Sequence, residues 1–573
     1  MNNLELTQIF NQMADLLEMK EVDFRSRAYR KAARVLDSLE KDVAEIYQAG
    51  GIKALKEIQG IGQALAKKIE EYIKTGQIKA YQKQKKQSPV DIEALTNIEG
   101  LGPRKIKALY QKLGIKNVKG LTKAAKAGKI GKLEGFGPKS EQNILQGIKM
   151  AKIDKGRFLL GAILPIVREI ISQIKELPEV KKISVAGSVR RMKETVGDVD
   201  ILVVSSKPKT VMDFFTEMKG VIKIWAKGPT KSSVRLRAGF DCDLRIVKRE
   251  SFGAALQYFT GSKDHNILTR RIAIKKGLKL NEYGVFSVKG GKNRRIAGQN
   301  EKQVYQAIGL PYIEPEMRTN TGEIEAGLAN QLPKLIDYDD IKGDCHTHTE
   351  WSDSTGTIEE LAKIAKQMGY QYLVITDHAS PLGILHGLDE KRLLKQMAEI
   401  DKINKRVSGI KILKGVEVDI TRDGSLTIKD EVLAKLDLVL GAVHSGFKLT
   451  KQDMTERLIK AMKNPHLDVI AHPTGRVIQR RESYQLDFPK IFKTAKQTKT
   501  ALEINAHASR LDLRDSHIRQ AVEAGVKMVI GTDVHSRAYF QMMELGIAQA
   551  RRGWAGKKDI LNSKPLKEFL KSF

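Results

Sequence analysis

The length and charge of the chain set the first limits. A chain of 573 residues exceeds the usual size of one domain, so several domains are expected. Its 100 Lys and Arg residues against 68 Asp and Glu residues give a net charge of +32, which favours a polyanionic partner over a merely solvated basic surface. Two cysteines exclude a disulfide framework, and neither a signal peptide nor a membrane-spanning apolar run is found, so a cytoplasmic protein is expected.

The first part of the chain, from about residue 9 to residue 145, has a helical and basic pattern without good strand candidates. A glycine-x-glycine signature occurs there three times, each time before a basic helical stretch. The glycines are Gly60 and Gly62, Gly100 and Gly102, and Gly135 and Gly137. Such a turn points backbone N–H groups outward at a helix N-terminus, where they bind phosphate without reading bases. One such turn is usually only a turn, but three at this spacing resemble helix-hairpin-helix clamps on the DNA backbone.

Two aspartates lie two residues apart on a predicted strand that follows. Asp198 and Asp200 therefore present their carboxylates on one face, and Asp243 comes from a third strand-like segment, 240–247. Three converging carboxylates need cations between them, and hard oxygen ligands favour Mg²⁺. Two such ions can activate a 3′-hydroxyl and stabilise a leaving pyrophosphate. Asp241 points the same way as Asp243 but is not expected to be a ligand.

A glycine-serine turn precedes this pair. Gly187 and Ser188 can approach a triphosphate closely, and Arg191 supplies a cation for it. The pattern that joins them to Gly197 and the two aspartates is typical of the nucleotidyltransferase superfamily. A lone Asp-x-Asp on a strand is usually a solvent-facing pair, but the glycine-serine turn and the later aspartate argue against that alternative here.

Histidines concentrate in the second half of the chain, where only His265 of the 11 precedes His346. Residues 316–339 contain Pro, Gly and acidic residues without a clean period and are expected to be a linker. An alternation of β and α patterns follows, with about seven strand candidates. Polar residues fall where those strands end, as in a closed β/α barrel. Clustered imidazoles and carboxylates suit two or three Zn²⁺, Mn²⁺ or iron ions. His265, without ligand partners, is expected to be structural.

The first glycine turn and residues 24–33 resemble the lyase-type N-terminal domain of family X DNA polymerases. The resemblance implies that Arg25 and Lys56 contact the 5′-phosphate downstream of a gap. Lys68 falls where animal members place the Schiff-base lysine of lyase chemistry. Ala64, one turn earlier, replaces a lysine of that pattern, so the pocket is less basic and Lys68 is equally well explained as a contact to the DNA backbone.

The run that begins at Tyr258 resembles the thumb of the same family. By that resemblance Tyr258, Phe259 and Gly261 line the sugar pocket and exclude a 2′-hydroxyl. Asn266 would contact the incoming base, and Arg270 the template minor groove. The alternative for Tyr258 and Phe259 is an aromatic pair in the core.

The C-terminal half resembles the polymerase-and-histidinol-phosphatase (PHP) domain, a distorted barrel with a trinuclear metal site. The resemblance implies nine metal ligands, which are His346, His348, Asp353, His378, Glu417, His444, His472, Asp533 and His535. Glu417 would bridge two metals, whereas Asp377 and Asp419 would orient imidazoles. Arg510 would hold a substrate phosphate.

The whole chain therefore resembles a bacterial family X DNA polymerase with a C-terminal PHP domain. The implied fold is multidomain, with an α-helical helix-hairpin-helix region, an α+β nucleotidyltransferase palm and thumb, and a distorted (β/α)7-type barrel. The expected parts are a lyase-like domain (1–85), fingers (86–150), palm (151–255), thumb (256–315), linker (316–339) and PHP domain (340–573).

The function implied by this resemblance is the filling of short DNA gaps in base excision repair. A Mn²⁺-dependent 3′→5′ exonuclease in the PHP domain and abasic-site endonuclease activity are also implied. Gapped DNA with a 5′-phosphate and dNTPs are the expected partners of a monomer near the bacterial nucleoid, with Mg²⁺ or Mn²⁺ at the polymerase site and two or three Mn²⁺ or Zn²⁺ ions at the PHP site. The alternatives are a template-independent nucleotidyltransferase, a PHP domain that is a small-molecule phosphatase or a structural metal site, and a DNA-binding scaffold.

Overall fold

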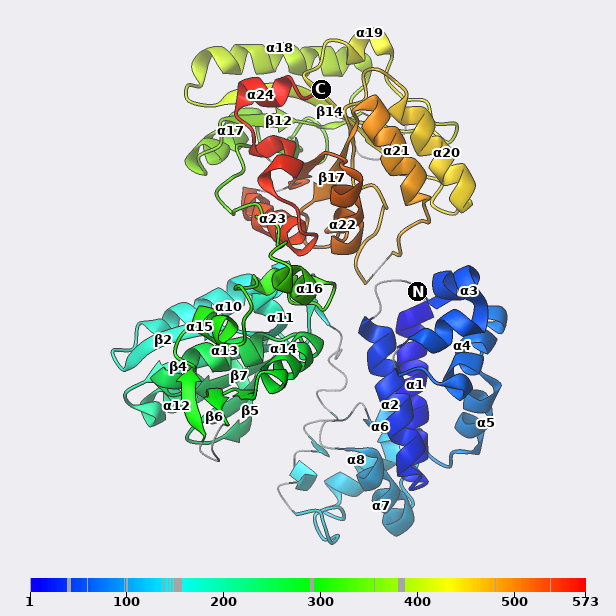
Figure 1. Ribbon diagram of the computed structural model, residues 1–573. Helices are drawn as coiled ribbons and strands as arrows, with labels where there is room; N and C mark the ends of the chain where they lie inside the picture. The colour runs from blue at the N-terminus through cyan, green and yellow to red at the C-terminus, as the bar shows by residue number, and fades with distance from the viewer. Residues whose placement is uncertain are drawn as a thin grey trace. The chain divides into compact units, whose positions relative to one another are not determined.

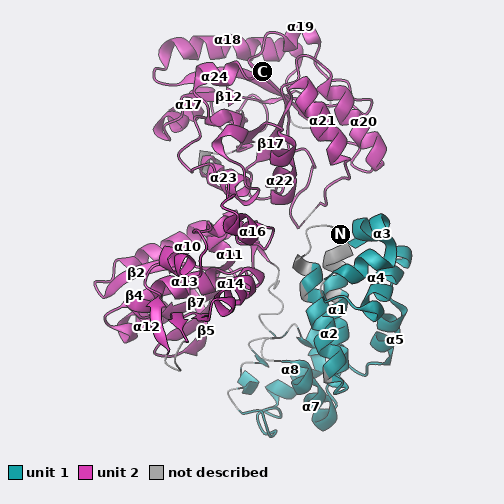
Figure 2. Cartoon of the chain, viewed as in Figure 1, with its two compact units in different colours: residues 1–156 teal, residues 157–573 magenta. Residues whose placement is uncertain are grey.

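The computed structural model divides into two compact units, residues 1–156 and 157–573 (Figure 2). It describes the chain from residue 2 to residue 573 except residues 39–42, 59, 97, 99, 100, 138, 139, 143, 146, 147, 149–156, 289–292, 355, 380–386, 480 and 536. Among the described residues, no helix has both the length and the apolar character needed to span a bilayer.

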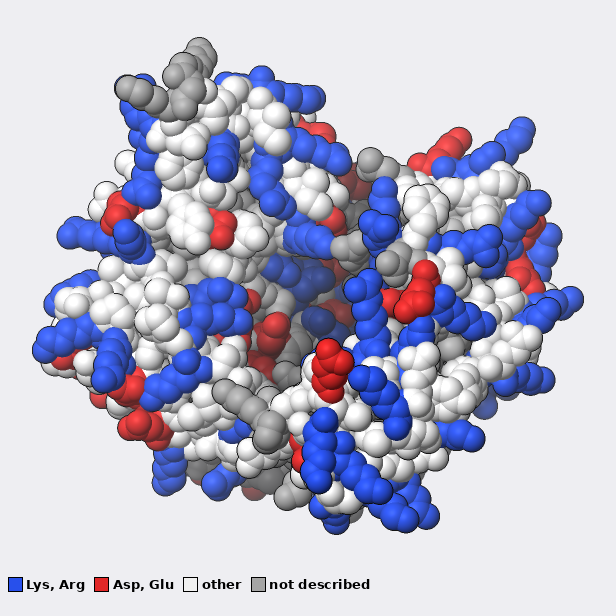
Figure 3. Space-filling model, turned by 90° about the horizontal axis from the view of Figure 1, so that it is seen from below, with Lys and Arg blue, Asp and Glu red and all other residues white. Residues whose placement is uncertain are grey.

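The first unit is helical, as the pattern predicts, and no strand is found in its described part (Figure 1). Its helices are α1 (Asn2–Met19), α2 (Asp23–Ser38), α3 (Val43–Glu57), α4 (Gln63–Thr75), α5 (Lys79–Gln87), α6 (Ile92–Thr96), α7 (Pro103–Leu113) and α8 (Val118–Lys126). One face of each helix enters a shared core, in which Phe10 and Tyr29 meet edge to face with ring centroids 5.3 Å apart. Lys and Arg side chains spread over much of the molecular surface seen in Figure 3.

The second unit begins with a mixed five-stranded sheet in the order β2-β4-β7-β6-β5. Its elements are β1 (Phe158–Leu159), α10 (Leu160–Lys175), β2 (Val180–Val185), α11 (Gly187–Arg190), β3 (Thr195–Val196), β4 (Asp198–Ser205), α12 (Pro208–Glu217), β5 (Val221–Lys227), β6 (Lys231–Leu236) and β7 (Asp241–Ile246). Alternation along β4 buries Val199, Ile201 and Val203 against α10 and α12. Asp198 and Asp200 therefore lie on the opposite face.

A smaller helical part with a three-stranded sheet follows. Its elements are η1 (Arg249–Ser251), α13 (Phe252–Thr260), α14 (Lys263–Lys275), β8 (Leu278–Asn281), β9 (Gly284–Ser287), β10 (Arg294–Ala297), α15 (Glu301–Ala307), η3 (Pro315–Met317) and α16 (Glu323–Leu328). His265 is fully buried between Glu323 and the hydroxyl of Tyr305, each 2.8 Å from a ring nitrogen, which confirms the structural role expected for it.

The segment expected to be a linker is part of this core. Met317 and Ile324 are buried in it, and Arg318 is buried completely. The apolar period that marks a packed segment is absent because buried charged residues do much of the packing, so the sequence pattern alone indicated a free connection.

The rest of the second unit is a parallel sheet in the order β11-β12-β14-β15-β16-β17-β18, with β13 paired to β14. Its strands are β11 (Gly343–Thr347), β12 (Tyr372–Ile375), β13 (His378–Ala379), β14 (Lys411–Asp419), β15 (Leu438–Ala442), β16 (Val469–Ile470), β17 (Ala501–Asn505) and β18 (Met528–Gly531). Its helices are α17 (Ile358–Gln367), α18 (Glu390–Arg406), α19 (Asp430–Leu433), α20 (Lys451–Met462), α21 (Phe488–Thr498), α22 (Asp515–Ala524), η4 (Arg537–Met542), α23 (Met543–Arg552), η5 (Lys557–Asp559), η6 (Leu561–Ser563) and α24 (Leu566–Leu570).

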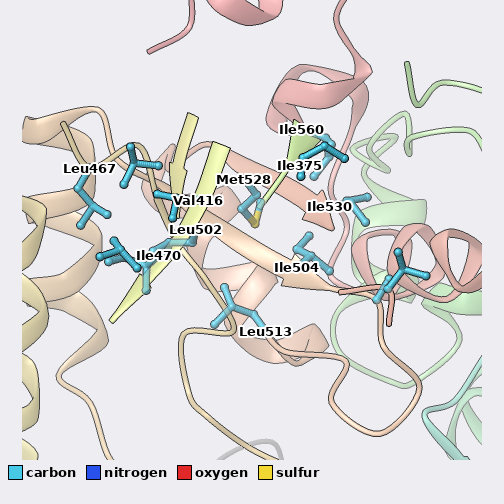
Figure 4. Packing of buried hydrophobic residues seen from close by; sticks show 14 of the residues in the cluster. Ile375, Val416, Leu467, Ile470, Leu502, Ile504, Leu513, Met528, Ile530 and Ile560 are labelled. Atoms are coloured by element: carbon cyan, nitrogen blue, oxygen red, sulfur yellow. The ribbon is translucent and has the colours of Figure 1, made fainter. Parts of the chain in front are cut away.

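Backbone hydrogen bonds close this sheet into a barrel. His348 N donates to Val534 O at 3.1 Å and Asp533 N donates to His346 O at 2.9 Å, so the first and last strands meet just beyond their ends. Aliphatic side chains from neighbouring strands, such as Ile504 of β17 and Ile530 of β18, pack together in the core shown in Figure 4. The (β/α)7-type barrel expected from the sequence is therefore confirmed.

Candidate active sites

The histidines and carboxylates at the ends of the barrel strands form one cluster. Eight of them fall into three groups whose ligand atoms lie within 4.8 Å of one another. The groups are His348, Asp353, His378 and His535; His346, His348 and Asp533; and His378, Glu417 and His444. The first group shares His348 with the second and His378 with the third, so the three groups are contiguous parts of one site.

Glu417 lies at the centre of the cluster and is buried. Its Oε2 is 2.7 Å from His378 Nδ1, and its Oε1 is 2.8 Å from His472 Nε2. His444 Nε2 and His346 Nε2 are 3.4 and 3.5 Å from the same carboxylate. The two oxygens thus face different imidazoles, which is the arrangement that a bridging carboxylate requires.

Several buried polar atoms of this cluster have no hydrogen-bond partner among the residues that the structure describes. They are His346 Nε2, His348 Nδ1 and Nε2, His472 Nδ1 and Glu417 Oε2, whose close approach to His378 Nδ1 does not form a hydrogen bond. A buried polar atom without a partner is costly, and native proteins contain few of them. The donor set of imidazole nitrogens and carboxylate oxygens, directed at one another, therefore fits divalent metal ions.

The electrostatics of the cluster also favour cations. Burial lowers the pKa of His444, but Glu417 and Asp419 outweigh it and raise that pKa to about 10. Burial also lowers the pKa of His346, but Glu503, Asp533 and Glu417 outweigh it and hold that pKa well above its ordinary value. Burial and the neighbouring His378 lower the pKa of His348 to about 4. Metal binding at neutral pH should therefore release protons from His346 and His444.

Carboxylates behind the imidazoles fix their orientation. Asp419 Oδ1 lies 2.6 Å from His444 Nδ1, as expected from the sequence. Glu503, which the sequence analysis did not single out, lies 2.6 Å from His346 Nδ1 and accepts from the backbone N–H of His472 at 2.6 Å. Such partners fix the ring and raise its basicity toward a metal.

The expectation that Asp377 orients an imidazole was wrong. Its carboxylate accepts from the backbone and hydroxyl of Thr349 at 2.7 and 2.6 Å, from Ser352 Oγ at 2.5 Å and from Gln396 Nε2 at 2.6 Å. It therefore holds the loop that leads to Asp353. Arg510 Nε lies 3.4 Å from Asp533 Oδ2, at the edge of the cluster.

The three aspartates lie on the neighbouring parallel strands β4 and β7. The register pairs Asp200 with Asp243, and Asp198 with Asp241. Burial, Asp198 and Asp243 together raise the pKa of Asp200 to about 6. This like-charge strain is what a divalent cation would relieve, so the residues fit Mg²⁺ or Mn²⁺.

Two neighbours on β6 contact Asp243. Lys231 Nζ lies 2.7 Å from Asp243 Oδ2, and Ser233 Oγ donates to Oδ1 at 2.5 Å. Asp241 instead accepts from Arg235, with Nη2 at 2.7 Å, and from Trp225 Nε1 at 2.8 Å. A buried guanidinium, that of Arg235, thus holds both oxygens of Asp241, and this residue remains outside the expected metal site.

The glycine-serine turn lies directly over the aspartates. Gly187 has a φ of 62°, which favours glycine, and a Cβ there would lie 2.8 Å from Asp200 Oδ2, so the turn approaches this carboxylate closely. Ser188 follows within α11. Gly197 begins the approach to β4, and Arg157, which the sequence analysis did not single out, donates from Nε to Thr195 Oγ1 at 2.8 Å beside it.

The thumb residues named from the sequence lie near this turn. Tyr258 and Phe259 meet edge to face with centroids 5.1 Å apart, and Gly261 has a φ of 70°. The amide of Asn266 donates to Tyr258 O at 2.6 Å, which places it on the aromatic pair. Arg270 Nε donates to Asn266 O at 3.1 Å, so Tyr258, Phe259, Asn266 and Arg270 form one connected group.

The glycine turns of the first unit share one geometry. Ile61, Leu101 and Phe136, each between two glycines, donate their N–H to the residue three positions earlier. Gly62 and Gly102 are the N-caps of α4 and α7, without a side-chain cap, and space around both is open. Gly60 and Gly135 have φ of 104° and 82°, Gly137 is also open, and Gly100 lies outside the described residues. The described turns can expose N–H groups to a phosphate.

The cations expected to hold a 5′-phosphate belong to three helices. Arg25 is exposed on α2, Lys56 is exposed in the last turn of α3, and Lys68 is on α4. Lys68 Nζ donates to Ala64 O at 3.4 Å, one turn earlier on its own helix.

Comparison with known proteins agrees with this geometry. Residues 1–78 match the helix-hairpin-helix domain, 92–150 the SAM-like helix-hairpin-helix tandem, 255–319 the DNA polymerase beta thumb and 344–507 the PHP domain. The DNA polymerase/3′-5′ exonuclease PolX of Bacillus subtilis (strain 168) is 38% identical over 571 residues, which cover 99% of this chain and 98% of that protein. The chain belongs to the family X DNA polymerases with a C-terminal PHP domain.

Other similar proteins cover only part of this family X chain. A probable phosphatase of Thermoanaerobacter sp. (strain X514) is 29% identical over 242 residues, or 40% of this chain and 94% of that protein. A probable phosphatase of Acetivibrio thermocellus is 32% identical over 201 residues, or 34% of this chain and 78% of that protein. Both matches therefore leave more than half of this chain uncovered.

Proposed function

We propose that this family X polymerase fills short gaps in DNA, as in base excision repair, and that its PHP domain removes nucleotides from 3′-ends. The observation that carries the proposal is the pairing of Asp200 with Asp243 beneath the Gly187 turn, in a chain that also holds the buried histidine cluster around Glu417. Similarity to a DNA polymerase/3′-5′ exonuclease along nearly the whole length supports both parts.

In the polymerase site the trio would hold Mg²⁺ or Mn²⁺. The ions would stabilise charge on the attacking 3′-oxygen and on the departing pyrophosphate. Ser188 and the cation of Arg191 would bind the triphosphate, and Gly197 would leave room for it. Ser233 and Lys231 hold Asp243 in place before the nucleotide arrives.

In the sugar pocket the edge-to-face ring pair of Tyr258 and Phe259 would lie against the deoxyribose and exclude a 2′-hydroxyl. Asn266, held on that pair, would contact the incoming base, and Arg270 the template. Gly261 keeps the backbone close to Arg191, because a Cβ there would lie 3.1 Å from its guanidinium.

In the PHP site nine residues would hold two or three Mn²⁺ or Zn²⁺ ions, with Glu417 as the bridge. The ions would polarise the scissile phosphodiester and stabilise the leaving 3′-oxygen. His472 would complete the ligand set. Its Nε2 lies beside Glu417, and its backbone N–H donates to Glu503. Arg510, next to Asp533, would hold the phosphate of the substrate.

The first unit would hold the DNA through its glycine turns. The proposed parts are a lyase-like domain (1–85), fingers (86–150), palm (151–255), thumb (256–315) and PHP domain (340–573), with 316–339 packed on the thumb. Arg25, Lys56 and Lys68 would favour a gap with a downstream 5′-phosphate. We propose that the protein acts as a monomer on gapped DNA and dNTPs at the bacterial nucleoid.

The test separates the two sites on one substrate, a duplex with a one-nucleotide gap. The double variant Asp198→Ala/Asp200→Ala should lose extension and keep 3′-end degradation, whereas His346→Ala and His444→Ala should lose degradation by orders of magnitude and keep extension. Both reactions are followed with Mg²⁺ and with Mn²⁺. Extension by the double aspartate variant would refute the polymerase assignment.

The histidine variants also distinguish the alternatives for the PHP domain. Unchanged 3′-end degradation would place the nuclease elsewhere. Loss of both reactions, together with a lower melting temperature, would identify a structural metal site. Hydrolysis of a small phosphomonoester but not of DNA would identify a small-molecule phosphatase.

A further inference from the structure

The turn that follows α11 is strained and rich in cations. It runs from Arg191 to Lys193, and Met192 between them has a φ of 50°, which a side chain other than glycine rarely adopts. Such a conformation persists only where its surroundings fix it. The contacts that hold this turn therefore decide where its two cations lie.

The two cations of the turn form no close ion pair, although Asp200 attracts Arg191 and Asp515 attracts Lys193. No ion pair joins Arg191 or Lys193 to a carboxylate within the described part of the chain, and the buried Nε of Arg191 has no hydrogen-bond partner there. Burial and repulsion by Arg552, Arg318 and Arg157 together lower the pKa of Arg191 to about 10. Burial and repulsion by Arg552 and Arg191 lower the pKa of Lys193. The turn therefore carries an excess of positive charge that suits an anion.

One side chain of the PHP domain contacts this turn directly, and a second, Arg476, pairs with the adjacent Glu194, with Nη2 2.7 Å from Oε2. Arg552, the last residue of α23, is buried, and its Nη1 donates to the carbonyl oxygen of Arg191 at 3.1 Å. Its Nη2 donates to Asp515, the first residue of α22. Burial raises the pKa of Asp515, but the attraction of Arg552 outweighs it and lowers that pKa to about 2. The planar guanidinium thus ties the backbone of the turn to a second helix of the PHP domain.

The thumb holds the other side of the same short helix. Arg190 donates from Nη1 and Nη2 to the two carboxylate oxygens of Glu301 at 2.9 and 2.7 Å. The guanidinium of Arg191 also donates to the backbone oxygen of Thr260. The helix that carries Gly187 and Ser188 is therefore fixed from the thumb through side chains and from the PHP domain through Arg552.

We propose that Arg552 is a positioning residue of the polymerase site, which fixes the turn from Arg191 to Lys193 so that both cations face the triphosphate of the incoming nucleotide. The PHP domain would then be required for tight nucleotide binding in addition to its own reaction. This inference rests on the proposed polymerase function and adds to it a contribution from another domain. Arg552 does not touch the nucleotide; it acts through the backbone of Arg191.

The test compares Arg552→Met with a matched control at the same domain boundary. Glu544→Gln breaks another palm–PHP ion pair, in which Arg168 Nη2 lies 2.5 Å from Glu544 Oε1, and that pair has no contact with the turn. Steady-state extension of a gapped duplex is measured at varied dNTP for the full-length proteins. Loss of a charge-assisted hydrogen bond to the turn should raise KM for dNTP about tenfold in Arg552→Met, with kcat changed much less, whereas Glu544→Gln should behave as the wild type.

The conservative variant and the second reaction make the result unambiguous. Arg552→Lys keeps the charge but cannot donate from two fixed nitrogens to Arg191 and Asp515 at once. Its KM for dNTP should therefore lie between those of wild type and Arg552→Met. Degradation of 3′-ends should be unchanged in all three variants. An equal KM for dNTP in Arg552→Met and Glu544→Gln would overturn the inference, as would a KM for Arg552→Lys no lower than that of Arg552→Met. Failure of the wild type to extend would instead refute the polymerase function itself.

Discussion

Replacing Glu301 by Gln should destabilise the palm–thumb junction strongly. Glu301 is buried and accepts hydrogen bonds from Arg190 on α11 and from Arg318, whose Nη1 lies 2.6 Å away. Arg318 is itself completely buried. The Gln side chain keeps the shape and removes the charge, so a buried guanidinium loses its counter-ion.

The magnitude follows from the pKa of Glu301. Burial raises that pKa, but Arg318 and Arg190 outweigh it and lower it from 4.5 to about 2. At about 1.4 kcal/mol for each pH unit, this difference corresponds to about 3 kcal/mol of stability from the ionised carboxylate. The value agrees with the range of about 3–5 kcal/mol for breaking a buried ion pair. An exposed pair such as the one broken by Glu544→Gln should cost less than about 1 kcal/mol.

Hydrogen exchange of the α15 amides measures this effect locally, because a chain of several domains does not unfold in one step. At neutral pH, exchange in Glu301→Gln should be about a hundredfold faster than in the wild type. Since the folded pKa is lowered, the contribution of Glu301 is complete above pH 4.5 and is lost as the pH falls toward 2. The two proteins should therefore converge in acid. A difference below about 1 kcal/mol at neutral pH, or one that does not shrink in acid, would refute the reasoning.

Three further predictions concern the two candidate active sites and the binding of DNA by the first unit. Glu503→Gln should weaken metal binding by the PHP site about 10- to 100-fold, seen as 3′-end degradation that recovers at high Mn²⁺; loss that excess metal does not restore would contradict it. Lys231→Met should lower the Mg²⁺ concentration needed for half-maximal extension, because the ammonium and the metal compete for Asp243, and a higher requirement would show that Lys231 assists binding. Lys68→Ala should reduce the preference for a downstream 5′-phosphate without affecting extension at a 5′-hydroxyl, and an unchanged preference would make Lys68 a general backbone contact.

The sequence by itself determined the chemistry and the local structure. The spacing of Asp198 and Asp200 placed both on one strand face, and alternation along β4 in the structure does the same. The three glycine turns were visible in the sequence, and the positive φ of Gly60 and of Gly135 explains a glycine at those positions. Histidines at the ends of β-rich segments indicated a barrel, since parallel strands bring their carboxyl ends together.

The tertiary structure alone decided which residues support these sites from a distance. Glu503 contacts His346 across 157 positions, and Arg552 contacts Arg191 across 361. Asp377 faces a loop and not an imidazole, although it directly precedes a histidine. The segment 316–339 packs through Arg318 and other buried charges that leave no apolar period. Sequence patterns report periodicity within one element and the chemistry of a residue type, whereas these contacts depend on how separate elements pack.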